Sequence, residues 1–422
     1  MTTDLSDHIS PARTGVERPP TGPRTAVAAS VADRLFRRAV RRLPLRVEYP
    51  DGLALGRMPD DPSAPLLVLH RPGDFATRLG AAGLIGFGES YMAGEWSAPD
   101  LAAVLTVFAA DIENLVPPVL QRLRRLYVAK HPRTERNTRR GSRGNIARHY
   151  DLSNEFFALF LDETMTYSSA LFPTTTPPPR WSDLAGAQER KMDRILDAAQ
   201  VGPGTRMLEI GTGWGALAVR AAERGATVRS VTLSVEQQRL ARERIAAAGA
   251  ADRVQVDLSD YREITGEYDA VISVEMIEAV GCEYLDTYFL AVRQLLAPRG
   301  RAALQVITMP HHRMLATRNT YTWIQKYIFP GGFLPSARLL ADTVGRHTDL
   351  RVSERFSMGG HYAQTLRLWR EQFTRNAAPA ADLGADPVFR RMWEFYLAYA
   401  EAGFRSGYLD VEQFLLTRGD EE

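Results

Sequence analysis

Cysteine is nearly absent from the chain, since Cys282 is the only one among 422 residues. A single cysteine cannot form an internal disulfide framework, and it cannot build a cysteine-rich metal site. The simplest interpretation of this composition is a protein of a reducing, cytosolic compartment. We therefore expect neither disulfide bonds nor bound metal.

Long apolar runs are also missing. No stretch approaches the roughly 18 uninterrupted apolar residues that indicate a membrane span. The first 25 residues are rich in Pro, Thr, Arg and Asp, and they lack the apolar core of a signal peptide. We predict a disordered leader over residues 1–25.

No large excess of one charge is present, since the formal net charge is +2. The basic residues are nevertheless clustered. Residues 29–43 (ASVADRLFRRAVRRL) predict a helix with five arginines, and residues 121–143 hold eight arginines and one lysine against one glutamate. The predicted apolar stripe of the helix consists of Val31, Leu35, Ala39 and Leu43. Both segments could be solvated surfaces, or they could dock on anionic lipid, where each near-surface charge contributes about 1 kcal/mol. No nucleic-acid recognition motif accompanies them, so we expect no nucleic-acid partner.

Composition divides the rest of the chain into three parts. Residues 26–115 carry short strand-like and helical runs and are the predicted N-terminal domain. Residues 116–144 are a basic linker punctuated by Pro and Gly. In residues 145–422, helix-length and strand-length segments alternate, which is the pattern of an α/β domain with a mainly parallel sheet. The predicted strands are residues 206–210, 227–232, 254–257, 270–274 and 301–307, with helices at 215–224 and 235–248.

The first of these strands leads into a glycine-rich turn, MLEIGTGWG at residues 207–215. Its three glycines permit unusual backbone angles and let a ligand approach the main chain. Doubly wound sheets bind ligands at the carboxyl end of such a strand. The spacing G-x-G-x-G differs from the dinucleotide-binding G-x-G-x-x-G, and no acidic residue ends the second strand. A hydride-transfer enzyme is therefore the weaker interpretation. The turn resembles the S-adenosylmethionine (SAM) loop of Rossmann-like methyltransferases.

Seven motifs, the glycine turn among them, narrow this interpretation. They are GLIGFGESYMAGEW (83–96), HYDLSNEFFALFLDETMTYSSALF (149–172), EIGTGWG (209–215), VTLSVEQ (231–237), ISVEMIEAVG (272–281), WIQKYIFPGGFLPS (323–336) and HYAQTLRLW (361–369). From about Gly83 to Glu412 the chain is similar to the cyclopropane-fatty-acyl-phospholipid synthase family. GESYMAGEW lies in the N-terminal domain that the phospholipid-modifying members possess and the shorter mycolic-acid synthases lack. The resemblance therefore implies a membrane phospholipid as substrate.

The resemblance implies a Rossmann-like class I SAM methyltransferase domain preceded by a smaller α+β lipid-binding domain. The implied SAM-binding residues are Tyr167, Ser168, Glu209, Gly211, Gly213, Thr232, Leu233, Gln237 and Asp260. Among them, Tyr167 and Ser168 would close over the methionine end of SAM, and Thr232, Leu233, Gln237 and Asp260 would lie near its adenosine. The resemblance also implies a bicarbonate ion that accepts a proton after methyl transfer. The implied catalytic residues around this ion are Glu278, Tyr362, Gln305, Ile307 and Ser169.

Two of these five positions depart from the family's pattern. Ser169 stands where the family has cysteine, and Gln305 stands where it has histidine. Serine keeps the backbone N–H, whereas Gln305 can donate and accept hydrogen bonds but cannot titrate. The way in which the proton is lost after methyl transfer decides whether a cyclopropane ring or an exocyclic methylene forms. The two substitutions alter the predicted base site, as we expect if the proton is lost in a different way. We therefore favour the methylene product.

We therefore expect an enzyme that transfers a one-carbon unit from SAM to double bonds in phospholipid acyl chains and gives a 10-methylene chain. A separate reductase could convert this product to a methyl branch of the tuberculostearic type. A ring-forming cyclopropane synthase is the nearest alternative. An inactive lipid-binding protein and a methyltransferase for soluble substrates or nucleic acid are more distant ones. The resemblance further implies a cytoplasmic homodimer, peripherally associated with the inner face of the cell membrane.

Overall fold

The computed structural model describes residue 16, residues 18–112 and residues 152–419. Most of the predicted leader and all of the predicted basic linker lie outside the described residues. The chain forms two compact units. The first comprises the described residues of Met1–His131 together with Asn319–Ile328 and Trp369–Tyr408, and the second those of Pro132–Arg318, Phe329–Leu368 and Leu409–Glu422. Two later segments thus belong to the N-terminal unit, whereas the sequence placed all of residues 145–422 in one domain.

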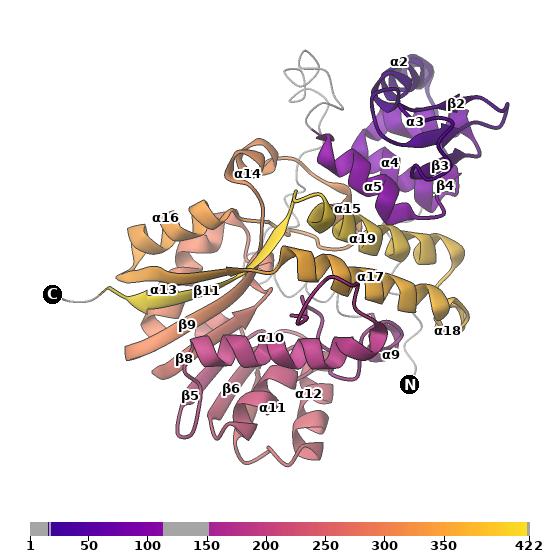
Figure 1. The fold of residues 1–422 in the computed structure, drawn as a ribbon. Coiled ribbons are helices and arrows are strands. Elements are labelled where there is room, and N and C mark those ends of the chain that lie inside the picture. Colours follow the sequence, from indigo (N-terminus) through magenta and orange to yellow (C-terminus); the bar gives the residue numbers. More distant parts are fainter. Residues whose placement is uncertain (1–15, 17, 113–151, 420–422) are drawn as a thin grey trace. The chain divides into compact units, whose positions relative to one another are not determined.

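The first unit contains a small four-stranded sheet in the order β2-β1-β3-β4. β1 is parallel to β3, and the other two pairings are antiparallel. The strands are β1 (Arg46–Glu48), β2 (Ala54–Leu55), β3 (Leu66–Leu69) and β4 (Trp96–Ser97). The helices, labelled in Figure 1, are α2 (Pro23–Val40), α3 (Pro72–Ala82), α4 (Leu84–Met92), α5 (Leu101–Ala110), α15 (Trp323–Tyr327), α18 (Ala377–Asp382) and α19 (Pro387–Arg405).

Helix α2 begins inside the segment expected as leader, and its buried stripe differs from the predicted one. Phe36 and Val40 are buried, whereas Val31 is 47% exposed. The Phe36 ring packs edge-on against Phe75 of α3, with 4.8 Å between the ring centroids. Within the helix the predicted stripe of Val31, Leu35 and Ala39 is therefore wrong by one residue, whereas its last member, Leu43, is buried. The bulky ring of Phe36 sets which face of the helix turns inward.

The GESYMAGEW segment (88–96) forms part of the interior of the first unit. A side-chain carbon at Gly88 would lie 2.5 Å from the Trp323 ring, so only glycine allows this close packing. Glu95 forms a fully buried ion pair with Arg78, with Nε 2.6 Å from Oε1. Removing either partner would leave an uncompensated buried charge. The motif therefore has a packing role within its own unit.

The second unit contains a seven-stranded sheet in the order β10-β11-β9-β8-β5-β6-β7. The strands are β5 (Arg206–Ile210), β6 (Thr227–Thr232), β7 (Val254–Leu258), β8 (Tyr268–Val274), β9 (Leu296–Thr308), β10 (Leu350–Ser357) and β11 (Asp410–Arg418). The pairings among β5 to β9 are parallel, and β11 is antiparallel to both neighbours, β9 and β10. This mainly parallel sheet confirms the predicted Rossmann-like α/β class.

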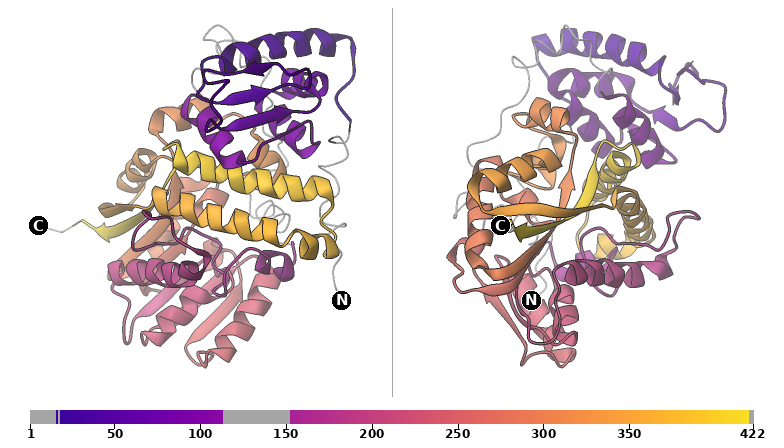
Figure 2. Two further views of the ribbon diagram at one scale, coloured as in Figure 1. Left: turned by 45° about the vertical axis from the view of Figure 1, so that its right-hand side comes forward. Right: turned by 60° about the vertical axis from the view of Figure 1, so that its left-hand side comes forward.

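Helices cover both faces of this sheet (Figure 2). The helices of the second unit are α9 (Asn154–Ala158), α10 (Leu184–Ala198), α11 (Ala216–Glu223), α12 (Val235–Ala247), α13 (Leu285–Leu295), α14 (His311–Thr317), α16 (Ala337–His347) and α17 (Gly359–Arg375), with short 3-10 turns at Trp181–Asp183, Tyr261–Glu263, Ile277–Ala279 and Cys282–Tyr284. Helix α17 continues past Leu368 into the first unit.

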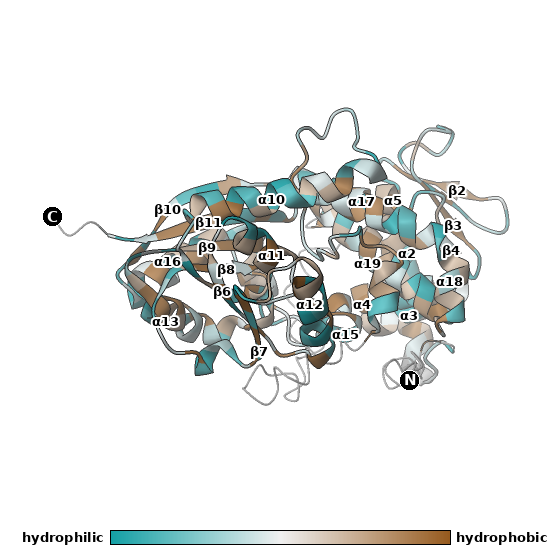
Figure 3. Cartoon of the chain, turned by 90° about the horizontal axis from the view of Figure 1, so that it is seen from below, coloured by the Kyte–Doolittle hydropathy of each residue, from teal (hydrophilic) through white to brown (hydrophobic). Residues whose placement is uncertain are grey.

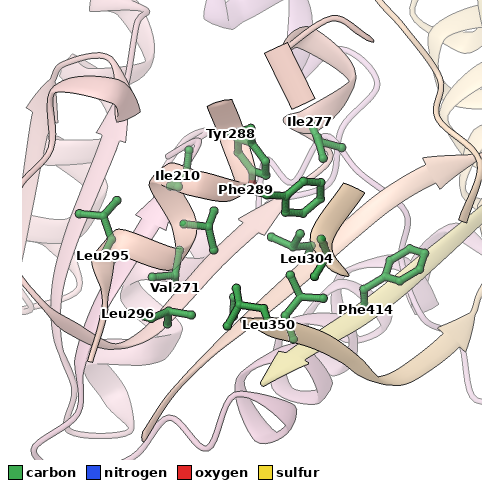
Figure 4. Packing of buried hydrophobic residues seen from close by; sticks show 14 of the residues in the cluster. Ile210, Val271, Ile277, Tyr288, Phe289, Leu295, Leu296, Leu304, Leu350 and Phe414 are labelled. Carbon is green, nitrogen blue, oxygen red and sulfur yellow. The ribbon is translucent and has the colours of Figure 1, made fainter. Parts of the chain in front are cut away.

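Neighbouring strand residues bury their side chains on opposite faces, as the pleat of a strand requires. Leu208 joins the apolar cluster formed with α13 and α16, and Met207 joins the cluster formed with α10, α11 and α12. Figure 4 shows part of the first cluster, with Phe289 of α13 near Leu304 of β9. Much of α12 is hydrophilic (Figure 3). Within the described part of the chain, no helix combines the length and apolarity needed to span a membrane.

Candidate active site

A cavity of about 180 Å³ lies in the second unit, next to the residues that follow β5, β6 and β8. The carboxyl ends of parallel strands are where open α/β sheets bind ligands. All nine residues that the sequence assigned to SAM line this one cavity. They are Tyr167, Ser168, Glu209, Gly211, Gly213, Thr232, Leu233, Gln237 and Asp260.

The glycine turn forms one wall of the cavity. Gly211, Gly213 and Gly215 have φ angles of 101°, 53° and 90°, in the region that favours glycine. The turn is anchored to the neighbouring strand, because the Gly211 N–H donates to the Val231 carbonyl at 3.0 Å. A side-chain carbon at Gly213 would meet nothing within 4 Å. The turn thus leaves its backbone open to a ligand.

Glu209 is the acidic residue of the turn, and its carboxylate is buried. It accepts a hydrogen bond from Ser230 Oγ at 2.5 Å. Burial raises the pKa of Glu209 to about 8, because the charged form is poorly solvated there. Lys191 also lines the cavity and donates from Nζ to Ser168 Oγ at 2.7 Å. Burial lowers the pKa of Lys191 to about 8. A cationic ligand such as the SAM sulfonium would favour the ionised form of Glu209.

The residues expected near the adenosine of SAM are already ordered by their own hydrogen bonds. Thr232 Oγ1 donates to Gln237 Oε1 at 2.9 Å. The Asp260 carboxylate is engaged by Arg262 through two contacts of 2.8 and 2.6 Å. These bonds hold the side chains in position along the cavity. They also mean that Asp260 would meet a ligand while paired with Arg262.

Aromatic rings border the cavity near the predicted methionine end of SAM. Tyr167 and Trp214 both line it. Phe157 packs against both, with ring centroids 5.3 Å from Tyr167 and 5.0 Å from Trp214. Such faces can attract a cation, by about 1–2 kcal/mol each when water is excluded. The cavity therefore combines a polar glycine turn with an aromatic wall.

Three of the five predicted catalytic residues converge on a carboxylate that the sequence analysis did not single out. The Ser169 backbone N–H and Gln305 Nε2 donate to Glu275 Oε1 at 2.9 and 2.8 Å. Tyr362 OH donates to Glu275 Oε2 at 2.7 Å. Gln413 Nε2 donates to Gln305 Oε1 at 3.0 Å, which turns the Gln305 amide nitrogen toward Glu275. Glu275 directly follows β8, and its position after a strand was the signal that could have identified it.

The other two predicted catalytic residues, Glu278 and Ile307, interact with each other. The Ile307 N–H donates to Glu278 Oε1, while Glu278 Oε2 is buried and has no hydrogen-bond partner among the described residues. Burial, with a further contribution from the charge of Glu275, raises the pKa of Glu278 to about 8. Two carboxylates therefore share this end of the site, and they cannot both be ionised without cost. Within residues 18–112 and 152–419, no group of three or more His, Cys, Asp or Glu is placed to hold a metal ion.

Comparisons with known proteins identify the family of this chain. The family model of mycolic acid cyclopropane synthetase matches residues 137–414. The tuberculostearic acid methyltransferase UfaA1 of Mycobacterium tuberculosis is 58% identical over 96% of this chain and 94% of its own length. The cyclopropane-fatty-acyl-phospholipid synthase of Escherichia coli is 34% identical over 85% of this chain and 90% of its own.

Two solved structures of cyclopropane synthases share the fold over much of the chain. The mycolic acid cyclopropane synthase CmaA1, complexed with SAH and CTAB, superimposes with a TM-score of 0.59 at 31% identity, covering 68% of this chain and 99% of its own. The cyclopropane synthase MmaA2 from Mycobacterium tuberculosis gives a TM-score of 0.60 at 30% identity, covering 65% and 98%.

The sheet, the glycine turn and the acid beside it define a Rossmann-like SAM-dependent methyltransferase. More narrowly, the chain belongs to the mycolic acid cyclopropane synthetase family.

Proposed function

We propose that this enzyme transfers the methyl group of SAM to the double bond of an unsaturated acyl chain in a membrane phospholipid, and that the product carries an exocyclic methylene at position 10. The observation that carries the proposal is one cavity, lined both by the SAM-binding candidates and by the Glu275 carboxylate. A methyl donor and a proton acceptor are the two parts that this reaction requires.

SAM enters this reaction as a co-substrate. The double bond supplies its π electrons to the methyl carbon, the carbon–sulfur bond breaks, and that electron pair remains on the sulfur of S-adenosylhomocysteine. The adjacent chain carbon becomes a cation, which the rings of Tyr167 and Trp214 would stabilise. The aromatic wall of the cavity would limit the access of water to this cation. Exclusion of water matters because water would capture the cation before a proton is lost.

The fate of the cation decides the product. Loss of a proton from the new methyl, with bonding to the cationic carbon, closes a cyclopropane ring. A hydride shift that moves the charge to the methylated carbon, followed by loss of a methyl proton, gives the methylene. The 58% identity with a tuberculostearic acid methyltransferase supports the second course, because a reductase could convert the methylene to a methyl branch. This reductase is the partner we propose.

A phospholipid substrate is supported by the share of this chain that aligns with each relative. The Escherichia coli relative, whose name specifies fatty-acyl phospholipid, aligns over 85% of the chain, whereas a cyclopropane mycolic acid synthase aligns over 64%. The family model matches residues 137–414, so we propose that the residues before this range are the part that the phospholipid-modifying relatives have in addition. The basic segment of residues 29–43 supports docking on an anionic membrane surface. Its exposed arginines are Arg34, Arg38, Arg41 and Arg42. Peripheral association with the inner face of the cell membrane, and the homodimer, remain parts of this proposal.

The test uses the full chain with methyl-tritiated SAM and vesicles of dioleoyl phosphatidylglycerol. We expect tritium in the extracted phospholipid, and none with vesicles of the saturated distearoyl lipid. Label in neither lipid, together with normal SAM binding by calorimetry, would contradict the proposed substrate. Failure to bind SAM at all would instead favour a lipid-binding protein without catalysis.

A further inference from the structure

Glu275 is held in an unfavourable backbone conformation for its residue type. Its φ is 49°, in the left-handed region that side-chain-bearing residues rarely adopt. A glycine would adopt this conformation without the same cost. The Glu275 N–H donates to the Gln305 carbonyl at 2.8 Å, and this bond helps to fix the backbone. Strain of this kind persists where the surroundings impose it, and it gathers at functional sites.

The strained backbone places the side chain where the resemblance puts an ion. Bicarbonate was expected to contact Glu278, a backbone group near Ile307 and three hydrogen-bond donors, namely a tyrosine, a backbone N–H near residue 169 and the side chain at 305. In this structure those three donors, from Tyr362, Ser169 and Gln305, all bond to the Glu275 carboxylate at 2.7–2.9 Å. The donors therefore do not fit a free bicarbonate, because a carboxylate of the chain itself already satisfies them.

We propose that Glu275 is the catalytic base of this enzyme and replaces bicarbonate as the proton acceptor. The inference rests on the proposed function, since it assigns the removal of the proton in that reaction to the Glu275 carboxylate. The Glu275 carboxylate lines the cavity next to the glycine turn, so it faces the space where the methyl group is delivered.

Hydrogen bonds and neighbouring charges decide which of the two glutamates, Glu275 or Glu278, is ionised. Three hydrogen bonds and the buried Lys191 ammonium favour a negative charge on Glu275, although burial raises its pKa. Glu278 has one donor, from Ile307, and its second oxygen is buried without a hydrogen-bond partner among the described residues. The proton shared by this pair therefore resides on Glu278. Glu275 stays ionised and able to accept another proton.

The step balances within the site. After methyl transfer and the hydride shift, one C–H bond of the new methyl breaks, its electron pair forms the carbon–carbon double bond of the methylene, and the proton moves to a Glu275 oxygen. The proton leaves to solvent after product release, which restores the carboxylate. No oxidant, reductant or further co-reactant is required.

The experiment compares the wild-type chain, Glu275→Gly and Glu275→Gln in the labelled-vesicle assay, in buffers purged of carbon dioxide. Glu283→Gln, at an exposed glutamate eight residues away, is the matched control. We expect wild type and control to work equally well without bicarbonate. Both Glu275 variants should lose about 10²–10⁴-fold in turnover, the usual contribution of a general base, while calorimetry shows that each still binds SAM.

Chemical rescue completes the test. Glu275→Gly removes the side chain and suits the backbone, so added sodium formate or sodium bicarbonate should occupy the freed donors and restore part of the turnover. Glu275→Gln keeps its bulk and should show no rescue. The inference would be overturned if wild type needed bicarbonate, if either Glu275 variant retained normal turnover, or if Glu275→Gly bound SAM but responded to neither anion. A wild type that binds SAM and labels no lipid would instead refute the proposed function.

Discussion

Replacing Glu209 by glutamine should remove most of the pH dependence of SAM binding. In the unliganded chain the Glu209 pKa is about 8 because its carboxylate is buried. Below that pH the side chain is protonated, and a cationic ligand must displace the proton to gain a carboxylate partner. Affinity of the wild type should therefore rise with pH toward 8, by up to about tenfold, or ~1.4 kcal/mol, for each pH unit.

The assay is isothermal calorimetry between pH 6 and 7.5, in two buffers that differ in ionisation enthalpy. Lys191, with a pKa of about 8, stays largely charged in this window in the wild type. Wild type should release about one proton per SAM bound, and Glu209→Gln, which can keep a hydrogen bond to Ser230, should release almost none. The reasoning is refuted if wild type binds SAM with the same affinity at pH 6 and 7.5 and releases no proton.

Three further changes test other parts of the site and surface. Gly213→Val should abolish measurable SAM binding by calorimetry and cost about 1–2 kcal/mol of folding free energy, since a branched residue is strained at φ 53°; unchanged affinity would refute the placement of the loop. Glu278→Gln should keep SAM binding and turnover near the wild-type values, because glutamine is neutral like the protonated Glu278 and Glu275 remains the base; a loss of roughly 100-fold or more would show that Glu278 itself exchanges a proton during turnover. Neutralising the exposed arginines should weaken flotation with anionic vesicles most at low salt, where screening is least and each charge contributes about 1 kcal/mol; unaltered flotation would make the basic segment a solvated face. That variant carries glutamine at Arg34, Arg38, Arg41 and Arg42.

The parallel part of the large sheet could be predicted well from the sequence. β5 and β6 have the predicted bounds, and β7 differs by one residue. These strands are short apolar runs closed by turn residues, and such local patterns carry the information. β11 was not predicted, although it lies between β9 and β10. Its position depends on pairing with strands about 60 and 110 residues earlier in the chain, which no local pattern encodes.

The sequence predicted most of the residues that form the candidate site, but it did not predict which of them contact one another. The nine SAM-binding candidates follow from motifs, and their shared cavity agrees with that assignment. Glu275 was missed because the resemblance directed attention to Glu278, three residues later in the same motif. The substitutions at Ser169 and Gln305 signalled an altered base site. Only the structure shows that both positions hydrogen-bond a carboxylate supplied by the chain itself.

The most direct measurement is ¹³C NMR of the phospholipid made by the full chain from SAM labelled with ¹³C in the methyl group and dioleoyl phosphatidylglycerol vesicles. The account predicts the label in an olefinic CH₂ carbon of the acyl chain. An acyl chain without label would contradict methyl transfer to the lipid, and label in a cyclopropane carbon would contradict the methylene product.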